Sequence, residues 1–225
     1  MMKNRQKGFT IIELLIATSV FSMLLLIILT AVTIVGKMYY KGVTNAKTQE
    51  VARRLAEDIS QQLQYSSDAP APKGGLPLTF NSGDKLGFCV GEVRYIIVPN
   101  KLVTPGKHAI WADRDAFQTP VPCTVTDVNM DAAQPSTTPH ARDLLPEDMR
   151  LLDLKILPLN SQGTLWKIYV KVAYGVDDLL VDSTDYTQKI SPSNFRNAVC
   201  KGSEVGSQFC SVSEIEATVY RRLAK

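Results

Sequence analysis

The chain of 225 residues is 45% hydrophobic and 21% charged, a composition typical of a folded protein and unlike that of a disordered one. Its net charge of +3 comes from the first eight residues, which hold Lys3, Arg5 and Lys7 and no acid. Basic and acidic residues therefore balance from Phe9 to Lys225, so bulk charge gives no support to a nucleic-acid partner.

A charge-free apolar segment follows the basic start. Residues 14–35 contain no charged side chain, and most of them are aliphatic. A helix of this length covers roughly 33 Å, enough to cross a hydrocarbon core of about 30 Å. Because basic residues that flank a span stay cytoplasmic, we expect a single-pass cytoplasmic (inner) membrane protein whose residues beyond 35 are extracytoplasmic.

A secretory signal peptide also combines positive charge with an apolar run. Three features argue against it: the run is longer than an ordinary signal core, no small-x-small cleavage site follows within reach, and Glu13 stands just before the uninterrupted stretch. An unpaired carboxylate in lipid costs on the order of a few kcal/mol. We therefore expect Glu13 to have a function, although a solvated glutamate on an ordinary membrane anchor is the alternative.

Residues 7–17, Lys-Gly-Phe-Thr-Ile-Ile-Glu-Leu-Leu-Ile-Ala, closely resemble the class III signal of type IV prepilins. The resemblance implies cleavage between Gly8 and Phe9 by a membrane aspartic prepilin peptidase, followed by N-methylation of Phe9. Gly8 suits such a site because, without a Cβ, its backbone can lie extended close to the peptidase's catalytic groups. The resemblance also implies that Glu13 pairs with the terminal ammonium of a neighbouring subunit and so selects register during assembly.

Four segments are predicted in chain order: a leader peptide at 1–8, a transmembrane and assembly helix at 9–35, an amphipathic half-helix at 36–66, and a β-rich extracytoplasmic domain at 67–225. The half-helix is recognised by apolar residues four apart among charged ones, namely Val51, Leu55, Ile59 and Leu63. A coiled coil is less favoured because this stripe lasts too few heptads. Prolines and glycines at 70–75 should end the helix.

Beyond residue 75 the apolar pattern alternates with the period of a strand. Residues 152–156 and 166–174 should form a hairpin around the turn at 160–163, with Leu152, Leu154 and Ile156 on one face. Weaker strands are predicted at 86–90, 92–98, 109–112 and 214–220. The expected fold is α+β and pilin-like, with an antiparallel sheet packed on the long helix. The proline-containing residues 120–146 are interpreted as a long surface excursion.

All four cysteines lie beyond the span, where an oxidising compartment permits disulfides. Of the three possible pairings we favour Cys200 with Cys210, which closes a short loop, and Cys89 with Cys123. No CxxC pair occurs, so a zinc site is less favoured, and free buried thiols are the other alternative.

Nothing in the sequence favours an enzyme. His108 and His140 have no recognisable nucleophile or metal-ligand companion, and GxSxG, HExxH and phosphate-binding glycine loops are missing. The acidic run of Asp177, Asp178, Asp182 and Asp185 could hold calcium but lacks EF-hand spacing, so a solvated loop is favoured. We predict no catalytic residue, no metal and no cofactor.

Weaker resemblances concern the branch of the family. Residues 213–222 look like the closing strand of large minor pilins, and residues 94–96 and 110–114 loosely resemble strands of the pilin W and pseudopilin J kind. Together with the length, they favour a minor pilin that primes or caps a pilus. A pseudopilin of a type II secretion or DNA-uptake machine, a major pilin, and a pilus-borne adhesin are the alternatives. The implied partners are other pilin subunits, the prepilin peptidase, the inner-membrane assembly platform and, before assembly, membrane lipid.

Overall fold

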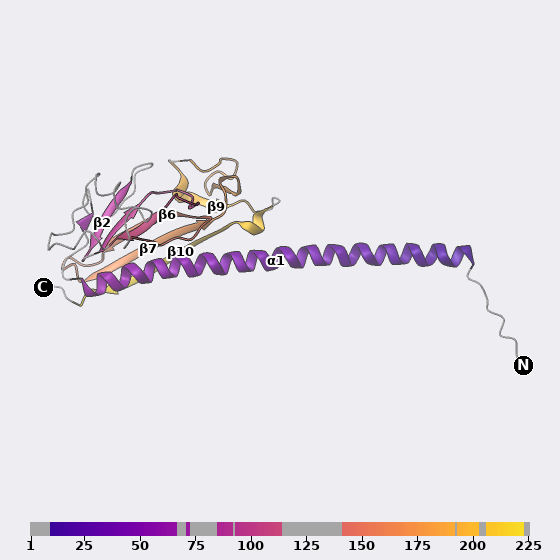
Figure 1. The fold of residues 1–225 in the computed structure, drawn as a ribbon, viewed down its shortest axis with the longest axis horizontal. Coiled ribbons are helices and arrows are strands. Elements are labelled where there is room, and N and C mark those ends of the chain that lie inside the picture. Colours follow the sequence, from indigo (N-terminus) through magenta and orange to yellow (C-terminus); the bar gives the residue numbers. More distant parts are fainter. Residues whose placement is uncertain are drawn as a thin grey trace, which may run out of the picture. The chain divides into compact units, whose positions relative to one another are not determined.

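The computed structural model describes residues 10–66, 71–72, 85–91, 93–113, 141–191, 193–202 and 206–222, with only the backbone at 71–72. Gly8, Phe9, Cys123 and His140 lie outside these residues. The chain divides into two compact units, which we call the helical unit (Met1–Tyr40) and the globular unit (Lys41–Lys225). The layout is the expected α+β: a long N-terminal helix, then antiparallel strands (Figure 1).

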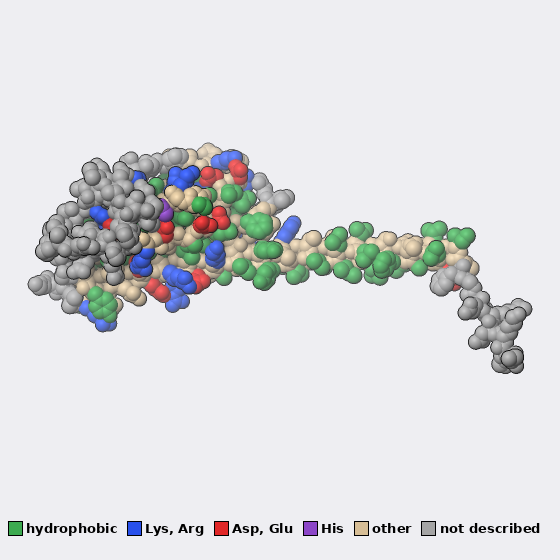
Figure 2. Space-filling model, in the orientation of Figure 1, with side chains coloured by type: hydrophobic (Ala, Val, Ile, Leu, Met, Phe, Trp, Pro, Cys, Tyr) green, Lys and Arg blue, Asp and Glu red, His purple; other side chains and the backbone are tan. Residues whose placement is uncertain are grey.

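The helix α1 (Ile11–Tyr65) supplies all the described structure of the helical unit. Its large apolar side chains from Ile11 to Tyr40 are exposed, and Figure 2 shows hydrophobic side chains distributed along the helix. A helix that is apolar all round requires an apolar surrounding. Within the described part of the chain, α1 is the helix whose length and composition would let it cross a membrane.

Hydroxyl side chains within the apolar stretch are satisfied by the helix itself. Each donates a hydrogen bond of 2.8 to 3.1 Å to a carbonyl oxygen three or four residues earlier; they are Thr18, Ser19, Ser22, Thr30 and Thr33. Because no water is present in a bilayer core, polar groups there must find partners inside the protein. These side chains therefore do not prevent lipid exposure.

In the globular unit α1 buries one face. Leu55, Ile59 and Leu63 of the predicted stripe are buried, but Val51 is only partly so. A second row, unpredicted, runs beside them and is made of small side chains four residues apart, namely Thr44, Thr48, Ala52 and Ala56. The predicted stripe is therefore confirmed at Leu55, Ile59 and Leu63, and Val51 packs against the core while partly exposed. The second row was missed because threonine and alanine carry little hydrophobic signal.

The strands within the described ranges form three antiparallel sheets rather than the one expected. The first has the order β1 (Ala71–Pro72), β2 (Leu86–Val90), β3 (Val93–Ile97), β4 (Ile110–Asp113), β5 (Arg142–Asp143). The second has the order β10 (Ser211–Tyr220), β7 (Leu165–Tyr174), β6 (Met149–Pro158). The third pairs β8 (Leu180–Asp182) with β9 (Ala198–Cys200), near the 3-10 turns η2 (Asp177–Leu179), η3 (Phe195–Asn197) and η4 (Ser207–Phe209).

The predicted hairpin is β6 with β7, but one face assignment was wrong. A register shift between Leu151 and Asp153 marks a β-bulge in β6. An extra residue in a strand reverses the faces before and after it. Leu154 and Ile156 therefore face the main core, whereas Leu152 packs in a second cluster with Phe195 and Cys210.

The main core joins the buried face of α1 to both larger sheets. Asp58 on α1 adds a polar link, since it accepts a 2.9 Å hydrogen bond from the Tyr95 hydroxyl on β3 and pairs with Arg142 on β5. Leu145 is also buried in this core. Residues 141–146 are the described end of the predicted surface excursion. Because they are partly packed into the domain, the prediction was wrong for this part.

Candidate functional site

The start of α1 is closed by reciprocal hydrogen bonds between Thr10 and Glu13. The backbone N–H of Glu13 donates to Thr10 Oγ1 at 3.3 Å, and the N–H of Thr10 donates to Glu13 Oε2 at 3.0 Å. The Thr10 hydroxyl donates to the same carboxylate oxygen at 2.8 Å. This arrangement is a capping box, with Thr10 at the N-cap and Glu13 as the third helical residue.

The capping box supplies Glu13 with partners inside its own chain. The negative carboxylate also lies at the positive end of the helix dipole, which favours it electrostatically. Both bonds to the carboxylate come from Thr10 and end on Oε2, and no described residue donates to the Oε1 atom. Sequence reasoning considered a terminal ammonium or solvent as the partner of Glu13 but not Thr10, although the Thr-x-x-Glu spacing was a sufficient signal for the cap.

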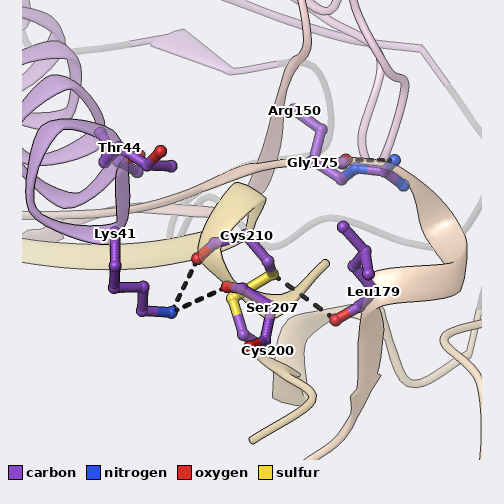
Figure 3. Close-up of a disulfide and its surroundings, with 9 residues drawn as sticks. Lys41, Thr44, Arg150, Gly175, Leu179, Cys200, Ser207 and Cys210 are labelled. Carbon is purple, nitrogen blue, oxygen red and sulfur yellow. Dashed lines mark hydrogen bonds between the residues drawn. A yellow bond between two sulfur atoms is a disulfide. The ribbon is translucent and has the colours of Figure 1, made fainter. Parts of the chain in front are cut away.

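The second constellation surrounds a disulfide between Cys200 and Cys210, whose Cα atoms are 5.8 Å apart (Figure 3). Lys41, the first residue of the globular unit, donates from Nζ to the carbonyl oxygens of Cys210 at 2.9 Å and Ser207 at 3.3 Å. The start of the docked helix is thus attached to the loop that the disulfide closes. Sequence reasoning missed Lys41, since its partners are backbone groups far along the chain.

Two further features complete the cysteine description. The Cys210 Sγ atom lies 3.5 Å from the carbonyl oxygen of Leu179; a disulfide sulfur carries no proton, so this is a close sulfur–oxygen contact. Cys89 is disulfide-bonded as well. Its predicted partner, Cys123, lies outside the described residues, so that pairing stays a proposal.

The four acidic residues considered for calcium all have partners among the described residues. Asp177 pairs with the buried Arg150, and Asp178 pairs with Lys189 at 2.6 Å, which lowers the pKa of Asp178. Asp182 and Asp185 accept from the backbone and hydroxyl of the threonine two residues on, and these bonds lower the pKa of both carboxyl groups. Within the described ranges, no group of three or more His, Cys, Asp or Glu residues could hold a metal ion.

His108 is the one described histidine. Its Nδ1 atom lies 2.8 Å from the carboxylate of Asp143 on β5. Its ring packs edge to face on Trp111, with the ring centroids 6.0 Å apart. The carboxylate fixes the orientation of the imidazole, but no described hydroxyl or thiol joins the pair, so the arrangement has no nucleophile.

Comparison with protein families finds the prokaryotic N-terminal methylation motif at residues 3–29. This match supports a type IV pilin-like prepilin, and proteins with this motif are structural rather than enzymatic. With the apolar helix α1 it indicates a membrane-anchored pilin, with pilin subunits and a prepilin peptidase as its general partners. None of the curated proteins and none of the solved structures compared with the chain matches it.

Proposed function

We propose that this protein is a minor type IV pilin, a structural subunit that primes or caps assembly of an extracytoplasmic pilus. The observation that carries the proposal is the capped Glu13 at the head of an exposed apolar helix. In this proposal residues 1–8 are a leader that the prepilin peptidase removes at Gly8. Phe9 then becomes the methylated terminus.

The capping box supports a specific way for Glu13 to act. Removal of the leader would create an ammonium at Phe9, directly before the N-cap residue Thr10. Thr10 already holds Oε2 of Glu13, which restricts the rotation of the carboxylate and orders it before a partner arrives. The Oε1 atom could then accept from the terminal ammonium of a neighbouring subunit. Burying both charges in a filament requires such a pairing.

The minor-subunit assignment has separate support. The chain is longer than major pilins and major pseudopilins tend to be. Its closing strand β10 ends in Thr-Val-Tyr and is followed by Arg221 and Arg222, a sequence that resembles large minor pilins. The disulfide between Cys200 and Cys210 fits an oxidising, extracytoplasmic compartment. The globular unit would accordingly be carried outside the cytoplasmic membrane, first on the anchor and then on the pilus.

Processing is tested by mass spectrometry of the N-terminal peptide from native cells. The proposal predicts a terminus at Phe9 carrying one additional methyl group, and Gly8→Val should leave the leader attached. A mature protein that still begins at Met1, or one cleaved after residue 35, would overturn the proposal.

Assembly is tested with two substitutions of Glu13 that separate its two roles. Glutamine can replace glutamate in a capping box, so Glu13→Gln should keep the helix start but remove the charge. Glu13→Ala should lose both. We expect both variants to be cleaved and both to be depleted from sheared filaments. If Glu13→Gln enters filaments normally while Glu13→Ala does not, Glu13 acts only as a cap.

The same filament preparation distinguishes a minor pilin from a pseudopilin. A minor pilin should be found in sheared pili at low stoichiometry, and its deletion should reduce the number of pili. Normal piliation in the deletion strain, together with loss of protein secretion or DNA uptake, would assign the chain to the other class of machine.

A further inference from the structure

A tightly folded connection between β3 and β4, residues 98–109, carries a group of basic side chains. Its two ends are joined by a 2.7 Å hydrogen bond from the Val98 N–H to the Ala109 carbonyl. Its tip is a turn in which Thr104 and Lys107 exchange backbone bonds of 2.8 and 3.2 Å. Pro105 and Gly106, whose φ is +75°, are the residues such a turn requires. The connection is therefore a defined structure.

Backbone bonds also attach this connection to β6. Asn100 donates to the carbonyl of Leu151, and Val103 donates to that of Met149, both at 2.9 Å. Asp148 donates back to Val103 at 3.0 Å. Side chains on a loop that is fixed to a sheet in this way keep their positions when a ligand arrives, which lowers the entropic cost of binding.

The connection forms most of a pocket of about 210 Å³. Its lining consists of three lysines, one histidine and three uncharged residues: Lys85, Lys101, Lys107, His108, Val98, Gly106 and Trp111. Of the described residues that line the pocket, none is acidic. Lys101 and Lys107 make no side-chain hydrogen bond or ion pair with any described residue, so both ammonium groups remain available to a ligand.

His108 contributes its ring to the lining of the same pocket. Asp143 holds its Nδ1 atom at 2.8 Å. The Nε2 atom is buried and has no hydrogen-bond partner among the described residues. The indole of Trp111, which is 1% exposed, packs against the imidazole ring of His108.

We propose that this pocket binds a phosphate or sulfate group. Lys101 and Lys107 would supply charge-assisted hydrogen bonds to the oxyanion. The volume is below the roughly 300 to 1,000 Å³ of pockets for drug-sized ligands, so the bound part would be one oxyanion with a small organic substituent. Nothing in processing or filament assembly requires this site, so it is an additional function.

The test is calorimetric titration of the full chain, purified in an uncharged detergent, with inorganic phosphate and with glycerol 1-phosphate. Saturable binding of either anion is expected, with glycerol giving none. Tighter binding of glycerol 1-phosphate would identify a phosphomonoester as the ligand class, whereas equal binding would identify the free anion. No saturable binding of either anion, or equal binding of glycerol, would overturn the proposal.

Variants locate the binding. Lys101→Gln/Lys107→Gln should weaken it by on the order of tenfold or more, because two charged contacts are lost, and Lys101→Arg/Lys107→Arg should retain it. The matched control is Lys47→Gln/Lys189→Gln, which removes two positive charges outside the pocket and should leave affinity within about twofold. Equal weakening by both glutamine pairs would show diffuse attraction to a basic surface and would sink the assignment. This assay needs neither leader cleavage nor filaments, so its failure is distinguishable from failure of the proposed function.

Discussion

Lys41 Nζ donates a 2.9 Å hydrogen bond to the carbonyl oxygen of Cys210, the residue whose sulfur closes the disulfide with Cys200. The two residues are 169 positions apart in the chain. Lys41 is also the first residue of the globular unit, so this contact fixes the docked part of α1 at its beginning. Together with its 3.3 Å bond to the Ser207 carbonyl, it connects the helix to the loop that the disulfide closes.

The first prediction concerns the stability that this contact provides. Lys41→Met should lower the free energy of unfolding of the globular unit by about 1–2 kcal/mol, because two carbonyl oxygens lose a charged donor in a partly buried site. Denaturant unfolding, followed by fluorescence of the buried Trp111 and Trp166, measures the change. Lys101→Met is the control and should stay within about 0.5 kcal/mol. Equal effects of the two substitutions would contradict a specific role for Lys41.

The second prediction concerns the disulfides. Peptide mapping without reduction should return Cys200 linked to Cys210, and Cys89 linked to Cys123. Cys200→Ala/Cys210→Ala should cost about 2–4 kcal/mol, the usual range for a bridge that closes a short loop. Combined with Lys41→Met, the loss should be less than additive, because the loop that receives the lysine is already loosened. A Cys89–Cys200 peptide would show the proposed pairing to be wrong.

The third prediction contrasts two glycines. Gly42 is helical with no atom within 4 Å of a built Cβ, so Gly42→Ala should stabilise the globular unit by about 0.5–1 kcal/mol. Gly175 has φ +117°, and a Cβ there would lie 2.9 Å from the carbonyl oxygen of Phe209. Gly175→Ala should therefore destabilise it by more than about 2 kcal/mol. Thermal unfolding measures both variants: the melting temperature should rise for Gly42→Ala and fall for Gly175→Ala. Changes of the same sign would contradict the prediction.

The fourth prediction concerns Asp58, which links α1 to two strands. Asp58→Asn should lower stability by about 1–2 kcal/mol, since Arg142 loses its anion and the Tyr95 hydroxyl loses a charged acceptor. Glu57→Gln is a matched control on the same helix, where the exposed pair with Arg53 should contribute less than about 0.5 kcal/mol. Denaturant unfolding measures the stability of both variants. Equal losses of stability would show that Asp58 does not link α1 to the strands.

The fifth prediction concerns acid stability. The backbone N–H and hydroxyl of Thr184 lower the pKa of Asp182 below its ordinary 3.8. A depressed folded-state pKa contributes stability that is present above the unfolded value and is lost as pH falls through the folded value. Thr184→Val should therefore raise the Asp182 pKa toward 3.8 and shrink this contribution. NMR titration of the carboxyl carbon measures it, and an unchanged pKa would exclude the hydroxyl as a cause.

Local patterns in the sequence were enough for several features. A charge-free run specifies an apolar helix, and the alternation in residues 166–174 specifies β7, because both depend on which side chains must leave water. The Thr10-x-x-Glu13 cap was equally local, yet it was recognised only in the structure. The N-terminal methylation motif could be recognised from eleven consecutive residues for the same reason.

Tertiary structure decided what depends on distant partners. The strands β1, β5, β8 and β9 have two or three residues each, too few for a periodic pattern that would predict a strand. They form because they pair with neighbouring strands. The bulge beside Asp153 reversed a face assignment that simple alternation made wrongly. Lys41 at the disulfide loop and His108 beside Asp143 likewise join residues far apart in the chain. The sequence by itself determined the membrane helix, its capped start and the strongest hairpin, because backbone preferences and the spacing of buried side chains act between residues close in the chain. Only contacts between residues far apart in the chain could determine how the strands assemble into sheets and where the pocket forms.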